Sequence, residues 1–165
     1  MATTKKSIKE VEVNIGISTE NREAIANALS SVLADSYLLY LKTHNYHWNV
    51  TGKLFHSLHE QFEEQYTELA EAIDEIAERI RALGFRAPGT FKEFQSLTSI
   101  EEDSDQPDAK EMVSRLVGGN EQLLRTAREA LKPAQEGEDE ATIDLLTQRL
   151  DIHSKTAWML RSHLE

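Results

Sequence analysis

The sequence contains no cysteine, and this absence excludes three kinds of protein at once. Without thiols the chain cannot form a disulfide scaffold, a thiolate zinc site or a cysteine nucleophile. The sequence also lacks an uninterrupted apolar run of the roughly 18 residues that span a bilayer. Its basic start, Met1 to Lys6, leads into no apolar signal segment. We therefore expect a cytoplasmic protein with no membrane segment.

Basic residues are scarce, with 18 Lys and Arg against 29 Asp and Glu and a net charge of −11. Such a surplus repels phosphate backbones unless the chain segregates a basic arm. Near the N-terminus, Lys5, Lys6 and Lys9 are offset by Glu10 and Glu12. DNA binding is therefore expected to be weak at physiological salt. The acidic surplus suits either a solvated surface or a protein that gathers hard cations, and composition alone leaves both open.

The three prolines and seven glycines are also few, and their positions divide the chain into long helical segments. Residues 1–17 are predicted to form a flexible N-terminal tail, and residues 18–165 one domain with a sizeable core. Apolar residues recur at helical spacing through that domain. They predict four long helices over about 18–48, 53–83, 107–132 and 139–165.

Local signals place the ends of these helices. Gly84 is expected to cap the second long helix, Thr90 to begin a short helix, and Pro133 to stop the third long helix. The connection between the second and third long helices is long, as a crossover requires. The predicted fold class is therefore all-α, a four-helix bundle with a short extra helix between helices 2 and 3.

The segment from His44 to His59 and the acids that follow it carry the signal for metal binding. Neutral imidazole nitrogens, such as those of His47 and His59, are common ligands of iron and zinc. Asp74 and Glu78 are four residues apart, so they project from one face of a helix and can hold one cation. A lone histidine is more often structural than a ligand. The four side chains together predict a metal site.

One chain cannot assemble this site alone. His59 and Asp74 are 15 positions apart in one predicted helix, which separates them by about 22 Å. Metal–ligand bonds are only about 2 Å long. A two-fold axis between antiparallel copies of that helix would let His47 and His59 of one subunit face Asp74 and Glu78 of the other. The sequence therefore predicts a homo-oligomer with metal sites between subunits.

The angular positions of these residues support that arrangement. At about 100° per residue, His59, Glu63, Asp74 and Glu78 fall on one shoulder beside the buried apolar stripe. Ordinary di-iron bundles instead use Glu-x-x-His pairs on facing helices, a motif that this sequence lacks. We therefore expect no di-iron site inside a single subunit. An acidic face lies further round the helix, and its members are Glu60, Glu64, Glu71 and Glu75.

These residues resemble the ferroxidase signature of the Dps family of DNA-protection proteins. The matching features are the run His47-Trp48-Asn49-Val50, the twelve-residue step to His59, and Asp74-x-x-x-Glu78-Arg79. The resemblance covers nearly the whole chain, including the short helix and the ending from Lys155 to Arg161. It implies a ferritin-like four-helix bundle that assembles into a hollow dodecamer with iron sites between subunits. It also implies oxidation of Fe(II), preferably by hydrogen peroxide, storage of ferric mineral, and protection of DNA from oxidative damage.

The same resemblance implies roles for individual residues. His47, His59, Asp74 and Glu78 would be iron ligands, and Glu63 an extra or bridging one. Trp48 would lie beside the site and take up stray oxidising equivalents. Mineral nucleation would fall to Glu60, Glu63 and Glu64, and the lining of iron-entry pores to Glu138, Asp139, Glu140 and Asp144.

The same residues also allow interpretations that are less specific to this family. The metal site could hold zinc structurally in a non-enzymatic protein that compacts the nucleoid, or zinc could compete with iron. His44 and His56 are expected outside the ligand set, either beside the ligands or at the surface. His153 and Trp158 have core-like neighbours and are interpreted as packing residues.

Overall fold

The structure is a computed structural model that describes residues 13–165, and every regular element in that range is a helix. Residues 1–12 of the predicted tail, with Lys5, Lys6 and Lys9, lie outside the described residues. The helices are α1 (Thr19–Asn49), α2 (Phe55–Ala82), α3 (Phe91–Leu97), α4 (Ala109–Glu136) and α5 (Glu140–Arg161).

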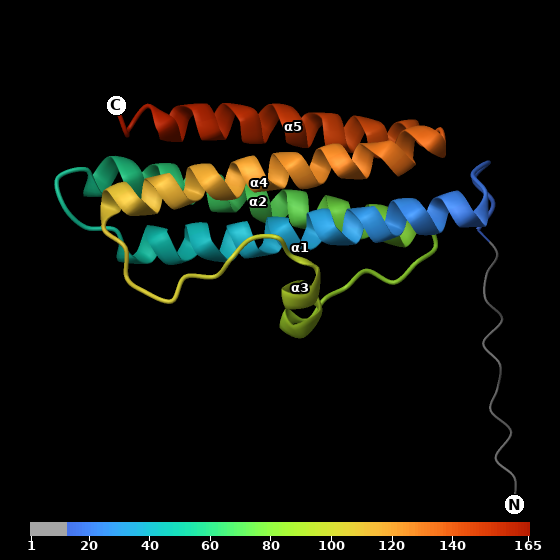
Figure 1. The fold of residues 1–165 in the computed structure, drawn as a ribbon, viewed down its shortest axis with the longest axis horizontal. Helices are drawn as coiled ribbons and strands as arrows, with labels where there is room; N and C mark the ends of the chain where they lie inside the picture. The colour runs from blue at the N-terminus through green and yellow to red at the C-terminus, as the bar shows by residue number, and fades with distance from the viewer. Residues whose placement is uncertain (1–12) are drawn as a thin grey trace, which may run out of the picture.

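The four long helices form a bundle of two antiparallel hairpins (Figure 1). Helix α1 packs on α2, α4 packs on α5, and contacts between α1 and α4 join the hairpins. The short helix α3 lies across α1 on the crossover from α2 to α4. The predicted fold class is confirmed. The core is apolar and fills the space between the helices with side chains such as Ile25, Leu29, Leu33, Phe62, Ile76, Ile80, Leu116 and Leu123.

Buried Asp35 ties the crossover to the bundle. Its carboxylate accepts hydrogen bonds from Thr98 Oγ1 at 2.7 Å, from the Ser99 backbone N–H at 2.6 Å and from Thr126 Oγ1 at 2.6 Å. Asp35 is on α1 and Thr126 on α4, so one carboxylate links three segments of the chain. A buried carboxyl group is tolerated only with such partners.

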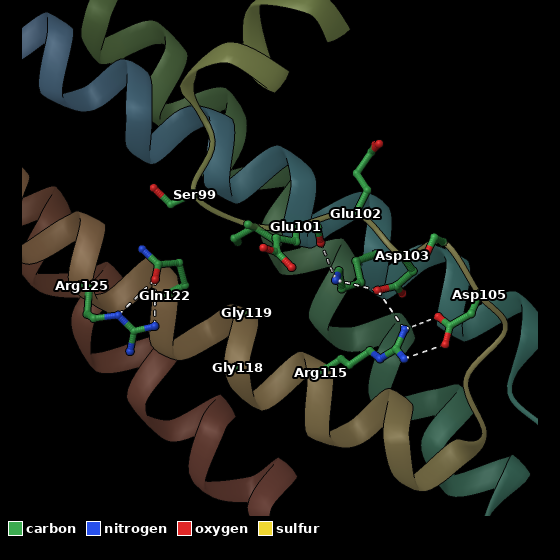
Figure 2. A pocket seen from close by; sticks show the side chains of 13 residues that line it. Ser99, Glu101, Glu102, Asp103, Asp105, Arg115, Gly118, Gly119, Gln122 and Arg125 are labelled. Carbon is green, nitrogen blue, oxygen red and sulfur yellow. Dashed lines mark hydrogen bonds and ion pairs between the residues drawn. The ribbon is translucent and has the colours of Figure 1, made fainter.

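A second polar cluster attaches the crossover to α1 and α4 at a position nearer the start of α4 (Figure 2). Lys42 donates to a carboxylate oxygen of Asp103 at 3.0 Å, and Arg115 donates to Asp105 at 2.9 Å. The buried Tyr46 hydroxyl also donates to Asp103. Burial and this hydrogen bond raise the pKa of Tyr46. Because Tyr46 precedes His47, the cluster also anchors the end of α1 that carries the histidine.

Helix α4 does not end before Pro133, where the sequence predicts its last residue. It continues through Pro133 to Glu136, although proline removes one helical hydrogen bond. Ala134 in the extra turn is fully buried. The carbonyls of Pro133 and Ala134 accept from the N–H groups of Gly137 and Asp139, each at 2.9 Å. Burial and these two bonds offset the one that is lost, so the predicted end at residue 132 is wrong.

The two packing predictions for α5 have opposite outcomes. His153 is 2% exposed, which confirms its interpretation as a core residue. Trp158 is 61% exposed on the chain, so its interpretation as a core residue is wrong. Five residues turn the helix by about 500°, which places Trp158 about 140° away from His153. The buried stripe continues instead through Ala157 and Leu160.

Helix α1 has the length and apolar composition of a membrane span, the only helix of residues 13–165 that meets this criterion. Half of its most apolar window is buried inside the bundle. Its residues Ile25, Leu29, Val32 and Leu33 belong to the core shared with the other helices. A central core helix meets the same criterion, and the packing accounts for the apolar composition of α1.

A buried polar network crosses the middle of the bundle. His153 Nδ1 donates to Asn120 Oδ1 at 2.8 Å, and Arg149 donates to His153 Nε2 at 2.9 Å. Arg149 also pairs with both carboxylate oxygens of Glu68. Burial, followed by the charge of Arg149, lowers the pKa of His153 to about 3. His153 is therefore neutral in the folded chain across the physiological range.

We expect this histidine to make the fold acid-sensitive. Below its ordinary pKa of 6.5 the unfolded chain binds a proton that the folded chain excludes down to about pH 3. Its contribution to stability is thus complete above pH 6.5 and is lost as the pH falls, by at most about 1.4 kcal/mol per pH unit. When urea unfolding is measured at a single protein concentration, the free energy of unfolding should fall less with decreasing pH for His153→Gln than for wild type. The exposed His163→Gln variant is the control, and parallel curves for wild type and His153→Gln would contradict the prediction.

Candidate metal centre

The α1–α2 hairpin brings two histidines into contact. His47 is in the last turn of α1 and His59 is in the second turn of α2, with a short turn between the helices. Gly52 adopts a φ of +102° in that turn, a conformation that costs glycine little. The two imidazole rings stack with centroids 3.8 Å apart and planes 19° from parallel. Residues twelve apart in sequence therefore share one site.

Each histidine is oriented by the backbone of the other. The Nδ1–H of His47 donates to the carbonyl of His59 at 2.8 Å, and the Nδ1–H of His59 donates to the carbonyl of His47 at 2.8 Å. A carbonyl can only accept, so the proton of each neutral ring is on Nδ1. Both Nε2 atoms then present a free lone pair. Hydrogen bonding of this kind sets the tautomer and orientation of metal-binding histidines.

Glu63 completes a convergent group of three ligands. It lies one turn after His59 on α2, and single ligand atoms of His47, His59 and Glu63 lie within 4.8 Å of one another. Among residues 13–165 this is the one such cluster of His, Asp and Glu. Two imidazoles with one carboxylate are a ligand set typical of Fe(II) with open coordination positions, and zinc also accepts them.

The structure does not bring Asp74 and Glu78 to this group. Both lie on α2, and Asp74 is about 22 Å of helical rise beyond His59. Their side chains are exposed and form no ion pair with residues 13–165. The prediction that they are ligands therefore stays a prediction, and it requires a second copy of the chain.

Aromatic rings surround the histidine pair. The His44 ring lies between Trp48, at a centroid distance of 4.0 Å, and Tyr66, at 4.2 Å. Tyr66 also meets His47 edge-on at 5.2 Å. Burial, followed by the charge of His47, lowers the pKa of His44. Trp48 itself is 60% exposed. The sequence motif pointed to Trp48, but it carried no signal for Tyr66, which comes from a separate turn of α2.

The acidic residues predicted to nucleate mineral lie along α2. Glu60, Glu63 and Glu64 are exposed and share one open depression with Glu68 and Glu71. His56, four residues before Glu60, lies on the same surface with its Nε2 3.5 Å from the Glu60 carboxylate. Of the two interpretations that the sequence allows for His56, a neighbour of the ligands or a surface group, its exposed position agrees with the second.

The predicted pore residues occupy different environments. Glu138, Glu140 and Asp144 are exposed near the start of α5. Asp139 is 2% exposed, and its carboxylate accepts hydrogen bonds from Arg79 at 2.7 Å and from Thr142. Burial alone would raise the pKa of Asp139, but the hydrogen bonds from Arg79 and Thr142 outweigh it and hold the pKa low. Asp139 therefore caps α5 and is the least accessible of the four.

Comparisons with known proteins agree with this architecture. A family model for the ferritin-like domain matches residues 26–165. DNA protection during starvation protein 2 of Bacillus anthracis is 42% identical over 144 residues, which cover 87% of this chain and 98% of that protein. The corresponding protein of Brevibacillus brevis is 38% identical over 147 residues, which cover 89% and 99%.

A solved structure of a Dps protein has the same fold as this chain. The Dps protein of Vibrio cholerae, described as a ferritin-like diiron-carboxylate protein, superimposes with a TM-score of 0.88. It is 37% identical, with coverage of 94% of this chain and 98% of that one. The family model, the relatives and the fold agree, and this chain belongs to the Dps family of the ferritin-like superfamily.

Proposed function

We propose that this protein is a cytoplasmic ferroxidase that stores iron. It binds Fe(II) between subunits, oxidises it, preferably with hydrogen peroxide, and keeps the ferric product inside a hollow dodecamer. The observation that carries the proposal is the convergence of His47, His59 and Glu63, with both Nε2 lone pairs free. The family relationship and the names of the relatives, which refer to DNA protection during starvation, point the same way.

The second copy supplies the remaining carboxylates. Pairing two α2 helices antiparallel about a two-fold axis would carry Asp74 and Glu78 of one subunit to the histidine pair of the other. An apolar depression supports this surface as the contact, because its lining includes Ile73 and Ala77, the residues just before the two acids. Phe91 of α3 also lines it and is 71% exposed on the single chain.

The histidines, Glu63 and the acidic surface of α2 have separate roles in the proposed reaction. The overall reaction converts two Fe(II), one hydrogen peroxide and two protons into two Fe(III) and two water molecules. The imidazoles of His47 and His59 bind Fe(II), while the carboxylate of Glu63 favours Fe(III) because it is the harder cation. The acidic depression on α2, which includes Glu60 and Glu64, is the next oxygen-rich surface for the ferric product. Consuming peroxide in this way protects DNA from the radicals that free iron would generate. Zinc fits the same ligands but has no redox chemistry, so it would inhibit.

Removing the histidines should abolish fast oxidation. We expect His47→Gly combined with His59→Gly to slow ferric formation by about 100-fold or more, because the ligand nitrogens are lost. The measurement is ferric absorbance after anaerobic Fe(II) loading and peroxide addition, with oligomer mass checked in parallel. His56→Gly, an exposed histidine on the same surface, is the matched control. Equal rates in wild type and the double variant would reject the ferroxidase, and loss of the oligomer would indicate a structural zinc site.

Mixing two inactive variants tests whether each site spans two subunits. One variant carries His47→Gly with His59→Gly, and the other carries Asp74→Ala with Glu78→Ala. In randomly mixed oligomers, about a quarter of the intersubunit sites would combine intact histidines with intact acids, so about a quarter of the wild-type rate should return. Sites built within one chain would recover nothing. The controls are two oligomers, each taken through the same procedure with one variant alone.

DNA binding is a separate property that the charge disfavours. Each copy adds a net charge of −11 to the oligomer, so we expect little binding at about 0.15 M salt. A filter-binding titration over salt concentration measures this. Tight binding at that salt, lost when Lys5, Lys6 and Lys9 are changed to Ala, would favour the nucleoid-compacting alternative.

A further inference from the structure

A cleft opens between α2 and α5, on a different side of the bundle from the candidate metal centre. Its volume is about 300 Å³, which suits a small molecule. Gln65 of α2 lines it, nine residues before Asp74. Nine residues turn a helix by about 900°, so these two side chains project from opposite sides of α2. The cleft is therefore separate from the surface on which a second copy is proposed to complete the metal centre.

One buried oxygen in this cleft has no partner. The side-chain oxygen Oε1 of Gln65 is buried and accepts no hydrogen bond from any residue in 13–165. A buried amide oxygen without a partner is unfavourable, because it has lost its hydrogen bonds to water and gained none from the protein. Such groups are rare in folded proteins, and a bound molecule that donates a hydrogen bond accounts for this one.

The other buried polar side chains of the cleft already have partners. Thr43 is buried and donates its hydroxyl hydrogen to a backbone carbonyl of α1 at 2.7 Å. Asn120 donates from its amide to a backbone carbonyl of α4 at 2.8 Å, and its Oδ1 accepts from His153 at 2.8 Å. The hydrogen bond still to be made in the interior of the cleft is therefore the one to Gln65, and only a donor can make it.

The charges that line the cleft favour a cation. Three carboxylates line it, those of Glu64, Glu68 and Asp151, and Lys155 is the one cationic side chain in its lining. Glu68 is paired with Arg149. Glu64 and Asp151 are exposed and form no ion pair within residues 13–165. An ammonium group fits both demands, because it is a cation with three donors and no acceptor.

Apolar side chains in the same cleft add a further requirement. Leu69 of α2 is buried, Ile152 of α5 is half-buried and Met159 of α5 is exposed. Methylene groups placed against these side chains would leave water, which is favourable. The ligand that matches the cleft therefore carries ammonium on a short hydrocarbon chain. Because Glu64 and Asp151 come from two different helices, they offer a place for a second ammonium group.

We propose that the cleft between α2 and α5 binds a small aliphatic diamine. One ammonium group donates to Oε1 of Gln65, the carbon chain lies against the apolar side chains, and the second ammonium group pairs with Glu64 and Asp151. Binding requires neither iron nor oxidation, so it does not depend on the proposed function. Glu64 also lines the acidic depression of α2, so a bound diamine would compete with ferric product for that carboxylate.

Calorimetric titration of the metal-free, full-length protein with 1,4-diaminobutane tests the proposal. The neutral probe 1,4-butanediol has the same carbon chain but no charge. We expect saturable binding of one diamine per chain and no binding of the diol. Gln65→Met keeps the size of the side chain and removes the acceptor, so it should weaken diamine binding by about 10-fold. The control is Gln95→Met on α3, which lies outside the cleft.

Two results of this titration would overturn the proposal. The first is equal affinity of the diamine for wild type and Gln65→Met. The second is the absence of saturable binding to wild type, which would leave water as the only donor to Oε1 of Gln65. Ferric formation by the same wild-type sample, measured separately, tests the proposed function, so failure of one proposal is distinguishable from failure of the other.

Charge variants separate a specific site from general attraction to an acidic protein. At about 0.15 M salt, charges more than about 8 Å apart are largely screened. Asp151→Asn should then weaken diamine binding severalfold, and Lys155→Gln should strengthen it. Glu71→Gln, which removes one negative charge from α2 outside the cleft, should leave the affinity nearly unchanged. Equal weakening by Asp151→Asn and Glu71→Gln would overturn the site.

Discussion

Two reciprocal hydrogen bonds fix the positions of the two histidines in the candidate metal site. Each imidazole of the pair His47 and His59 donates to the backbone carbonyl of the other, across the turn that joins α1 to α2. The bonds tie the end of one helix to the start of the next and leave both Nε2 atoms free, in a group whose ligand atoms, with those of Glu63, lie within 4.8 Å of one another. The candidate metal site and its contact with Tyr66 both depend on this arrangement.

The interior of the bundle explains why the metal centre lies at the end of a hairpin. In ordinary di-iron bundles, carboxylates and histidines on facing helices hold metal in the core. Here the buried His153 is bonded to the guanidinium of Arg149, which also pairs with Glu68, a carboxylate that is 38% exposed. Both ring nitrogens of His153 are occupied, one by Asn120 and one by Arg149, so this core histidine offers no free nitrogen to a cation. The candidate ligands among residues 13–165, His47, His59 and Glu63, lie instead at the end of the α1–α2 hairpin.

Particular residues show how far prediction from sequence reached. Gly84 and Thr90 mark helix ends in the structure, with a φ of +96° at the glycine and a capping box at the threonine, because capping is a local interaction. Pro133 and Trp158 were misjudged for the opposite reason. The turn after Pro133 persists because Ala134 is buried, and Trp158 is exposed because the buried stripe of α5 passes through its neighbours. Both outcomes depend on packing between helices.

The sequence by itself determined the helices, the acidic face of α2 and the spacing that separates His59 from Asp74, since each follows from helical periodicity and rise along one chain. It also supplied the candidate ligands His47, His59 and Glu63. Only the tertiary structure decided that these three converge, that the paired histidines share a tautomer, and that the ring of Tyr66 contacts His47. Those features join side chains from different helices, and their relative positions arise from packing across the hairpin, which no local pattern encodes.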